Sequence, residues 1–232
     1  VFSPYFPMYR TQIELAGGVC VDVPTYASED YAIDEARLRA AITPRTKAII
    51  FNNPTNPTGM AYGNDTLEML ARVAKEYDLL IAADEIYTTY LYEGDFRPLR
   101  TLPGMAERTI TLNSFSKNFL MTGWRVGVII AEPELLEVMN DINGSLIYTA
   151  PPISQRAAIH ALSMRREIRE KYVTAYRDRI FYTADRIEKI PYLSLVRPKG
   201  TFYLFPGIEK TGLTDDEFCN VLLDKAHVLV SH

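Results

Sequence analysis

Short apolar runs alternate with longer amphipathic stretches along the chain, and this alternation predicts the fold. Residues 47–51 and 79–83 are nearly continuous apolar runs between turn signals, a pattern typical of strands buried on both faces. Between them, residues 65–77 carry apolar side chains at helical spacing, which predicts an amphipathic helix. Because strand, helix and strand follow one another at this spacing, we expect a βαβ unit with parallel strands and a right-handed crossover.

The pattern extends in both directions from this unit. Further strands are predicted at residues 19–23, 109–113, 126–131 and 228–232, and residues 199–205 are predicted to form a turn followed by a strand. Further helices are predicted at residues 8–16, 134–140 and 152–161, after an Asp34 cap, and from a Thr214–Glu217 capping box to about 225. Residues 167–190 form a long apolar-striped segment without Gly or Pro, which predicts a helix that connects two domains.

Taken together, these elements predict an α/β protein: a three-layer α/β/α arrangement around a mostly parallel sheet, followed by part of a small α+β C-terminal domain. We expect residues 1–165 to form the large domain, residues 166–190 the connecting helix, and residues 191–232 the partial small domain. Strand-like segments lie at both ends of the chain, so we expect a central fragment of a longer protein, with unpaired sheet edges.

Composition excludes several classes of function. The 232 residues are 47% hydrophobic, with 25 basic and 29 acidic side chains and a net charge of −4, which gives no basic excess for nucleic acid or an anionic membrane. No apolar run approaches the roughly 18 residues of a membrane span. Cys20 and Cys219 lie far apart, as reduced cysteines of a cytoplasmic protein do. His160, His227 and His232 have no metal-ligand spacing, so we expect no metal site.

Polar, irregular segments follow three of the predicted strands. They are residues 52–59, 84–87 and 114–117. In open α/β sheets, ligands bind outside the carboxyl ends of the strands. We therefore expect these three segments to converge on one site.

The side chains in these segments have complementary chemistry. Lys117 can form a Schiff base with an aldehyde, and Asp84 can hold a cation or a protonated ring nitrogen. Tyr87 and Asn56 offer hydrogen bonds to a phenolate-type oxygen. Phosphate binding is predicted for Ser114, Ser116 and Arg125. Aldehyde, pyridinium, phenolate and phosphate are together the functional groups of pyridoxal 5′-phosphate.

Each of these residues also has an ordinary structural interpretation when it is taken alone. Asp84 can cap a helix or lie in a solvated turn, Tyr87 can serve for packing, and Asn56 can brace its proline-rich loop. Two serines before a lysine are common in turns, and most lysines are solvated. The combination at three strand ends, rather than any one residue, favours the cofactor site.

Four motifs carry a resemblance to a known family. They are Asn56-Pro57-Thr58-Gly59, Asp84-Glu85-Ile86-Tyr87, Ser114-Phe115-Ser116-Lys117 and Gly123-Trp124-Arg125-Val126-Gly127. In order and spacing they resemble the successive motifs of class I/II aminotransferases, the fold-type I pyridoxal-phosphate enzymes. The stretch from Pro198 to Tyr203 resembles the start of the family's small domain. The resemblance covers essentially the whole chain and makes the large domain the cofactor-binding domain.

The resemblance implies a role for each matching residue. Lys117 would form the internal aldimine and then act as the general base between Cα and C4′. Asp84 would keep the pyridine nitrogen protonated, while Tyr87 and Asn56 would bond the 3′-oxygen. The phosphate would be held by Ser114, Ser116 and Arg125. Phe6, or alternatively Tyr5, would stack on the ring, and Asn52 would lie near the substrate. Catalysis would rest on Lys117, Asp84 and Tyr87.

The function implied is transfer of an amino group from an amino acid to a 2-oxo acid by a cytoplasmic homodimer with a shared active site. Members of the family also have an earlier glycine-rich phosphate loop with a tyrosine lent by the partner subunit, and a late arginine for the substrate carboxylate. The chain lacks both segments, so we expect it to be inactive alone. A carbon–sulfur β-lyase on the same scaffold, the effector domain of a transcription regulator and a purely structural role are the alternatives.

Overall fold

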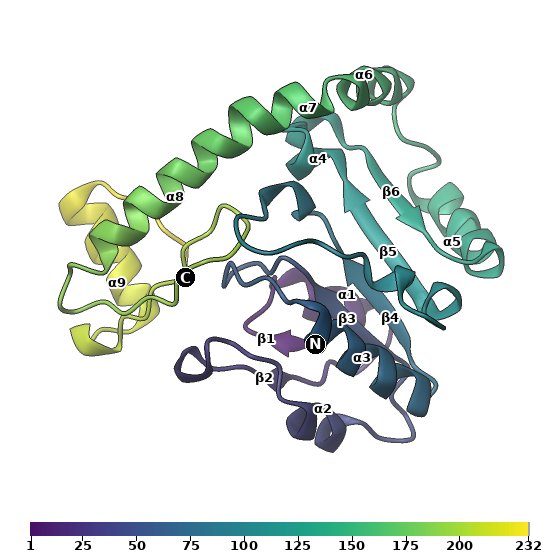
Figure 1. The fold of residues 1–232 in the computed structure, drawn as a ribbon, viewed down its shortest axis with the longest axis horizontal. Coiled ribbons are helices and arrows are strands. Elements are labelled where there is room, and N and C mark those ends of the chain that lie inside the picture. The colour runs from purple at the N-terminus through teal and green to yellow at the C-terminus, as the bar shows by residue number, and fades with distance from the viewer. Residues whose placement is uncertain (232) are drawn as a thin grey trace.

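A four-stranded sheet organises the computed structural model, which describes residues 1–231 (Figure 1). Its strands are β3 (Ala48–Asn52), β4 (Leu80–Asp84), β5 (Thr109–Ser114) and β6 (Gly127–Ile130), and they lie in the order β3-β4-β5-β6. The first three strands are parallel, and β6 is antiparallel to β5. The predicted α/β class with a mostly parallel sheet is confirmed.

Buried apolar side chains at alternate positions of β3 and β4 build the main core. Ile49, Phe51, Ile81 and Ala83 are all buried, as expected for strands that helices cover. Helix α3 (Asn64–Glu76) packs its apolar stripe against them. That stripe consists of Leu67, Leu70, Val73 and Ala74, each 0–1% exposed. The predicted βαβ unit is therefore present, with its helix within one residue of the expected bounds.

The remaining elements follow the predicted order. The other helices are α1 (Met8–Leu15), α2 (Glu35–Ala41), α4 (Phe115–Asn118), α5 (Pro133–Leu146), α6 (Pro152–Ser163), α7 (Arg165–Ile168), α8 (Thr174–Ile187) and α9 (Asp215–Val221). Asp34 caps α2 by accepting a hydrogen bond from the Arg37 amide, and Thr214 and Glu217 form the predicted capping box of α9. The strand predicted at residues 19–23 is wrong in its bounds. Only β2 (Val23–Pro24) forms there, and it pairs in parallel with β1 (Phe2–Ser3).

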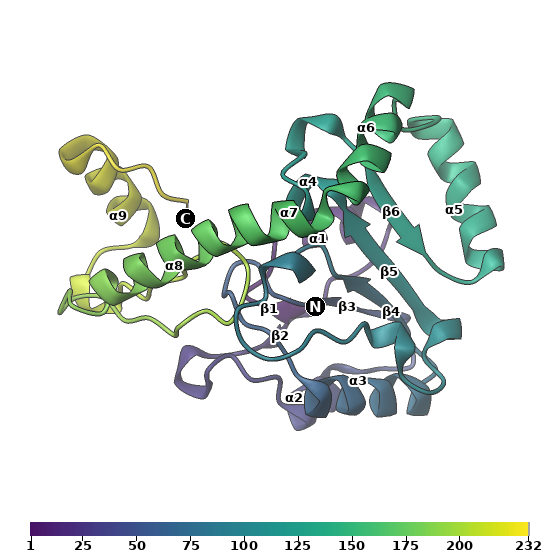
Figure 2. The same ribbon diagram turned by 45° about the horizontal axis from the view of Figure 1, so that its top comes forward.

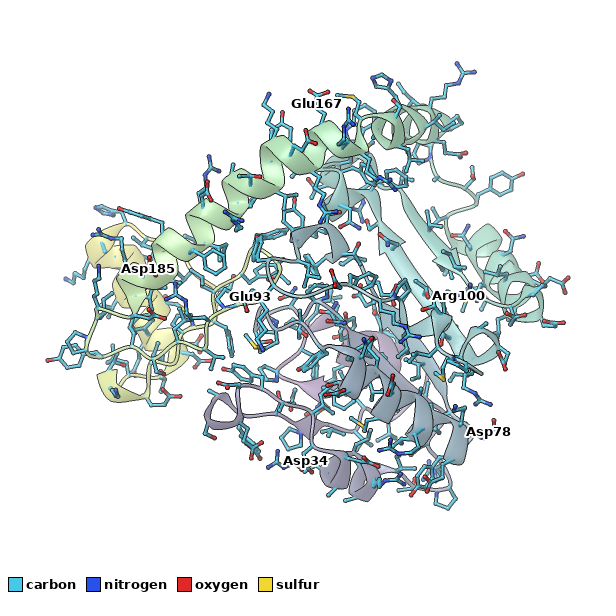
Figure 3. All side chains as sticks on the ribbon, in the orientation of Figure 1. Asp34, Asp78, Glu93, Arg100, Glu167 and Asp185 are labelled. Atoms are coloured by element: carbon cyan, nitrogen blue, oxygen red, sulfur yellow. The ribbon has the colours of Figure 1, made fainter. Side chains whose placement is uncertain are left out.

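A continuous helical segment leads away from the sheet. It begins with α7, passes through a π-helical turn at Arg169–Val173 and ends with α8. Figure 2 shows this segment extending from α6, beside the sheet, toward α9. In Figure 3, Glu167 marks its beginning and Asp185 lies near its far end.

Two predicted strands near the C-terminus do not form. The turn at 199–203 is present, but its backbone makes only isolated bridges, between Leu91 and Gly200 and between Ser194 and Gly207. Residues 228–231 follow His227, which has a left-handed φ of 56°, and Leu229 is 81% exposed. Strands need neighbouring strands to accept and donate their backbone hydrogen bonds, and within residues 1–231 neither segment pairs with a strand of a sheet. His232 lies outside the described residues.

The β6 side of the molecule exposes apolar side chains. Val128, Ile129 and Ile130 are each 42–44% exposed on this edge strand, and Leu146 at the end of α5 is 78% exposed. Within residues 1–231, no helix is both long enough and apolar enough to cross a membrane.

Candidate active site

The three predicted loops meet at one edge of the sheet. Parallel pairing places Asn52 opposite Asp84, and Asp84 opposite Leu112, so β3 and β4 end at the same level and β5 continues past it to Ser114. The polar segments that follow them therefore emerge at the same edge of the sheet, and Figure 1 shows α4 directly after β5. The sequence analysis predicted this convergence from the strand ends.

Asp84 is a buried carboxylate, 8% exposed, at the end of β4. The Tyr9 hydroxyl, from α1, donates a hydrogen bond to Oδ2, and the Ile86 amide donates to Oδ1 at 3.3 Å. Burial raises the pKa of Asp84 above its ordinary value, although the two donors lower it. Among residues 1–231, no lysine or arginine forms an ion pair with this carboxylate. Its surroundings suit a bound cation.

Asn52 braces the loop that carries Asn56. Its side-chain amide donates to the Asp84 carbonyl at 2.9 Å, and its side-chain oxygen accepts a hydrogen bond from the Asn56 amide at 2.7 Å. The Asn56 side chain then lies 3.4 Å from the Tyr87 hydroxyl. Asn56 and Tyr87, predicted to bind one oxygen of a ligand, are thus neighbours.

Tyr87 is 2% exposed, and its hydroxyl faces two polar groups. One is the side-chain amide of Asn56, and the other is the Tyr203 hydroxyl at 3.0 Å. Burial raises the pKa of Tyr87 well above its ordinary value. The phenol is therefore protonated at neutral pH and has a proton to donate.

Lys117 lies in α4, which begins directly after β5. Ser114 caps this helix, since its Oγ accepts a hydrogen bond from the Ser116 amide at 3.0 Å. The Lys117 carbonyl accepts a hydrogen bond from the Tyr90 hydroxyl at 3.1 Å. Its half-buried amine lies 5.6 Å from the centroid of the Phe202 ring, and it forms no ion pair in the described part of the chain. An amine without a carboxylate partner is free to react with an aldehyde.

The predicted phosphate-binding residues lie in two segments, around Ser114 and Arg125, that are joined by one backbone hydrogen bond. Phe115, next to Ser114, donates its amide to the Val126 carbonyl at 3.2 Å, and Val126 follows Arg125. Arg125 has a left-handed φ of 54° and donates to the Thr122 carbonyl at 2.9 Å. This backbone contact brings the segments of Ser114 and Arg125 together, without a hydrogen bond between the arginine and either serine in the described residues, and the role of these side chains stays a prediction.

Phe6 lies beside the group that contacts Asp84. Its ring meets the Tyr9 ring edge-on, with centroids 5.7 Å apart, and it is 39% exposed. Tyr5 instead donates to Asp22 at 3.0 Å on the outside of the fold. The Tyr5 ring also contacts the Tyr9 ring, with centroids 6.3 Å apart, so both aromatics that the sequence left open lie beside Tyr9. The stacking of Phe6 on a cofactor stays a prediction.

Glu85 is a second buried acid, 4% exposed, on the opposite side of the strand end from Asp84. It accepts a hydrogen bond from the Leu99 amide at 3.1 Å. Burial raises its pKa from the ordinary value of 4.5 to about 7, against the lowering effect of this hydrogen bond. Glu85 holds the 85–99 loop, which includes Tyr87, closed onto the sheet.

Three site residues were missed by the sequence analysis: Tyr9, Phe202 and Tyr203. A usable signal existed only for Tyr9, because it lies three positions after Phe6 and shares a helix face with it. A buried carboxylate also requires a donor. With fifteen tyrosines in the chain, neither argument selects this one.

The fold and the site together define a class of protein. A mostly parallel sheet brings a reactive amine, a buried carboxylate without a cation and a phenol–amide pair to its strand ends. This is the arrangement of an enzyme that binds an aldehyde cofactor built on a pyridine ring.

Comparison with known proteins agrees with this class. The family model for aminotransferase class I and II matches residues 1–232, and the chain belongs to that family. It is 36% identical to an aspartate aminotransferase of Bacillus sp. over 98% of this chain and 60% of that protein, and 38% identical to aromatic-amino-acid aminotransferase 2 of Thermococcus litoralis over 98% and 59%. The structure of Thermus thermophilus aspartate aminotransferase with maleate matches with a TM-score of 0.92 at 35% identity, over 96% of this chain and 58% of that one. The chain thus spans about three fifths of the length of these relatives.

Pyridoxal 5′-phosphate is the cofactor of this family, and the residues of the chain fit it. The buried Asp84 carboxylate lacks a cation, as a partner of a pyridinium nitrogen would. The Lys117 amine is free of carboxylates, and the Tyr87 phenol and Asn56 amide form a donor pair 3.4 Å apart for a phenolate oxygen. Each donor matches one functional group of the cofactor.

Proposed function

We propose that the protein containing this chain is an aminotransferase that moves an amino group from an amino acid to a 2-oxo acid. The observation that carries the proposal is the pairing of an unpartnered lysine amine with a buried, cation-free carboxylate at adjacent strand ends. Pyridoxal phosphate, when bound, supplies an aldehyde for amines and a ring that takes up the electrons released from the substrate Cα–H bond.

In this proposal the residues of the chain divide the work. Lys117 attaches the cofactor and, once an amino acid has displaced it, moves a proton at the substrate Cα. Asp84 holds the proton on the ring nitrogen, and its burial strengthens this charge interaction because water is excluded. Tyr87 and Asn56 donate hydrogen bonds to the phenolate oxygen.

The phosphate and the ring face complete the proposed binding. Ser114, Ser116 and Arg125 hold the phosphate, with the guanidinium of Arg125 as the charged donor. Phe6, whose ring contacts Tyr9 of α1, would stack on the cofactor ring. Together these residues would hold the cofactor, and the Lys117 amine would move the proton at the substrate Cα.

The wider organisation forms part of the same proposal. Residues 1–165 would form the cofactor-binding domain, residues 166–190 the connecting helix and residues 191–232 part of a small domain. In support, the helical segment of α7 and α8 leads from the sheet region to the segment around α9 (Figure 2). We propose a cytoplasmic homodimer with a shared active site, by analogy with the resembling family.

The names of the relatives do not agree on one amino donor. One relative is named for aspartate and another for aromatic amino acids. The proposal is therefore limited to an α-amino acid donor and a 2-oxo acid acceptor. Neither a lyase nor a regulator is among these relatives, and no observation in the structure favours those alternatives.

A half-reaction tests the proposal. The full-length gene product is loaded with pyridoxal phosphate and mixed with single amino acids, without an oxo acid. Conversion of the cofactor to its amine form, with one equivalent of 2-oxo acid released, is expected for at least one amino acid. If no amino acid converts the cofactor, or if cysteine conjugates instead yield pyruvate and a thiol, the aminotransferase proposal is wrong.

A further inference from the structure

The turn from Pro198 to Tyr203 is held between two loops of the site. The Lys199 and Gly200 amides both donate to the Gly59 carbonyl, at 2.8 and 2.9 Å, which fixes the turn to the Asn56 loop. The next amide, that of Thr201, donates to the Tyr90 carbonyl at 2.8 Å. One short turn therefore binds both the loop of Asn56 and the segment of Tyr87.

Close packing makes this turn rigid. A Cβ on Gly59 would lie 2.5 Å from Pro198 Cβ, and one on Gly200 would lie 2.8 Å from the Tyr90 carbonyl oxygen. Thr201 is fully buried with a φ of +64°, a left-handed conformation that a β-branched residue rarely adopts. Such a conformation persists only where the surroundings over-determine it, and it is typical of functional sites.

The rigid turn delivers the next two side chains to the site. The Phe202 ring lies 5.6 Å from the Lys117 amine and meets the Tyr87 ring edge-on, with centroids 5.6 Å apart. The Tyr203 hydroxyl lies 3.0 Å from the Tyr87 hydroxyl. The Tyr203 amide donates to Thr201 Oγ1 at 3.2 Å, so the strained residue also orients Tyr203.

The hydrogen-bond inventory indicates which hydroxyl donates. Within residues 1–231, the Tyr203 hydroxyl has Tyr87 as its sole hydrogen-bond partner. Tyr87 also faces the Asn56 amide, which is a donor. If Tyr203 donates, its proton has an acceptor and the proton of Tyr87 is free to point into the site.

We propose that Tyr203 is a positioning residue: its hydroxyl donates to Tyr87 and thereby directs the proton of Tyr87 toward the phenolate oxygen of the cofactor. The inference rests on the proposed function, because it needs the bound cofactor. A hydroxyl that accepts one hydrogen bond becomes a stronger donor in another, by roughly 10–30%. Tyr203 therefore strengthens the hydrogen bond that Tyr87 makes, without touching the cofactor itself.

The expected effect has a definite sign. A hydrogen bond donated to the phenolate oxygen stabilises the negative charge of that oxygen. It therefore favours loss of the cofactor proton whose titration changes the visible band. Loss of the Tyr203 hydroxyl weakens this donor, and the pH midpoint of the cofactor's visible band rises. For a hydrogen bond to a charged oxygen, a change of this size corresponds to about 0.1–0.7 pH units.

The test compares four variants of the cofactor-loaded full-length gene product by pH titration of the visible band. They are Tyr203→Phe, Tyr87→Phe, the double variant and Tyr176→Phe. Tyr176 is the matched control, because it packs on Phe202 with centroids 5.6 Å apart and its hydroxyl makes no hydrogen bond in the described chain. Tyr203→Phe is expected to raise the midpoint, Tyr176→Phe to leave it unchanged, and the double variant to match Tyr87→Phe.

Each other outcome overturns the inference. A midpoint that falls in Tyr203→Phe would mean that Tyr203 accepts rather than donates, and an unchanged midpoint would mean that the contact has no effect on the cofactor. A shift that adds fully to that of Tyr87→Phe would show that Tyr203 acts by another route. If the unmutated protein binds no cofactor, the proposed function itself fails. A visible band in the unmutated protein therefore separates the two failures.

Discussion

The hydrogen bond from Tyr9 to Asp84 gives the most informative single perturbation. Tyr9→Phe removes one hydroxyl from a buried carboxylate and leaves the ring, which packs edge-on against Phe6, in place. The carboxylate keeps its other donor, the Ile86 amide at 3.3 Å. The variant therefore changes the charge environment of Asp84 with little change in packing.

The expected magnitude follows from the charge of the acceptor. A hydrogen bond to a charged group contributes about 1.5–3 kcal/mol, so losing it weakens cofactor binding about 10- to 100-fold. Since the Tyr9 donor lowers the pKa of Asp84, its loss raises that pKa further above the ordinary value. Asp84 must be ionised to pair with the ring nitrogen. Binding by the variant is therefore expected to fail on acidification at a higher pH than binding by the unmutated protein.

The assay is a titration of the cofactor-free gene product with pyridoxal phosphate, followed by visible absorbance at several pH values. Tyr62→Phe is the matched control, because its hydroxyl donates to a neutral carbonyl, that of Tyr31, at 2.9 Å. The control is expected to bind the cofactor as the unmutated protein does. Equal affinity of the Tyr9 and Tyr62 variants would refute the reasoning, since it would mean that the Tyr9 hydrogen bond to Asp84 does not contribute to cofactor binding.

Three further predictions concern stability and binding. Glu85 keeps its proton in the folded state up to about pH 7, whereas an unfolded glutamate loses it near 4.5. The unfolding free energy of the cofactor-free protein should therefore fall by about 3 kcal/mol as the pH rises across this window. Glu85→Gln should make the unfolding free energy, measured in urea, depend less on pH. Gly59→Ala places a methyl group 2.5 Å from Pro198 Cβ at a φ of +72°, and should lower the unfolding free energy by about 2–4 kcal/mol, whereas Gly63→Ala, in open space, should change it by less than about 0.5 kcal/mol. Asp84→Asn should weaken cofactor binding about 100- to 1,000-fold, measured by the same titration, while the variant stays folded at pH 8; unchanged affinity would contradict the ion pair.

Local pattern was sufficient for the framework of the site. The buried strands before Asn52 and Asp84, with an amphipathic helix between them, imply parallel pairing without any long-range information. Parallel pairing then brings the strand ends to one edge of the sheet, and the structure shows this pairing. The positions of Asn56, Tyr87 and Lys117 near one another follow from these strand ends.

Contacts between residues far apart in the sequence could not be predicted from the local sequence pattern. Tyr9 lies 75 residues from Asp84, and Tyr203 lies 116 residues from Tyr87. Periodicity along the chain specifies which face of an element is buried, but not which of fifteen tyrosines meets a given acid. Tertiary packing settles that choice, so the support around the predicted residues emerged only from the structure.

The segment after Gly200 shows how a correct pattern leads to a wrong element. Thr201, Phe202 and Tyr203 have the β-branched and aromatic character of a strand, and a strand was predicted there. In the structure the two aromatic rings pack against Tyr87, with centroids 5.6 and 5.7 Å from its ring, and the backbone forms a turn. Apolar side chains indicate burial, and here burial is satisfied by ring packing instead of sheet pairing.

The central claim is that Lys117 carries the cofactor, and one measurement tests it most directly. The cofactor-loaded full-length gene product is treated with borohydride, which fixes the cofactor to the amine that holds it, then digested and mapped by mass spectrometry. The account predicts that the added mass lies on Lys117, in the peptide that includes Ser114 and Ser116, and that Lys117→Ala carries none. Added mass on a different lysine, or an equal amount of label in Lys117→Ala, would contradict it.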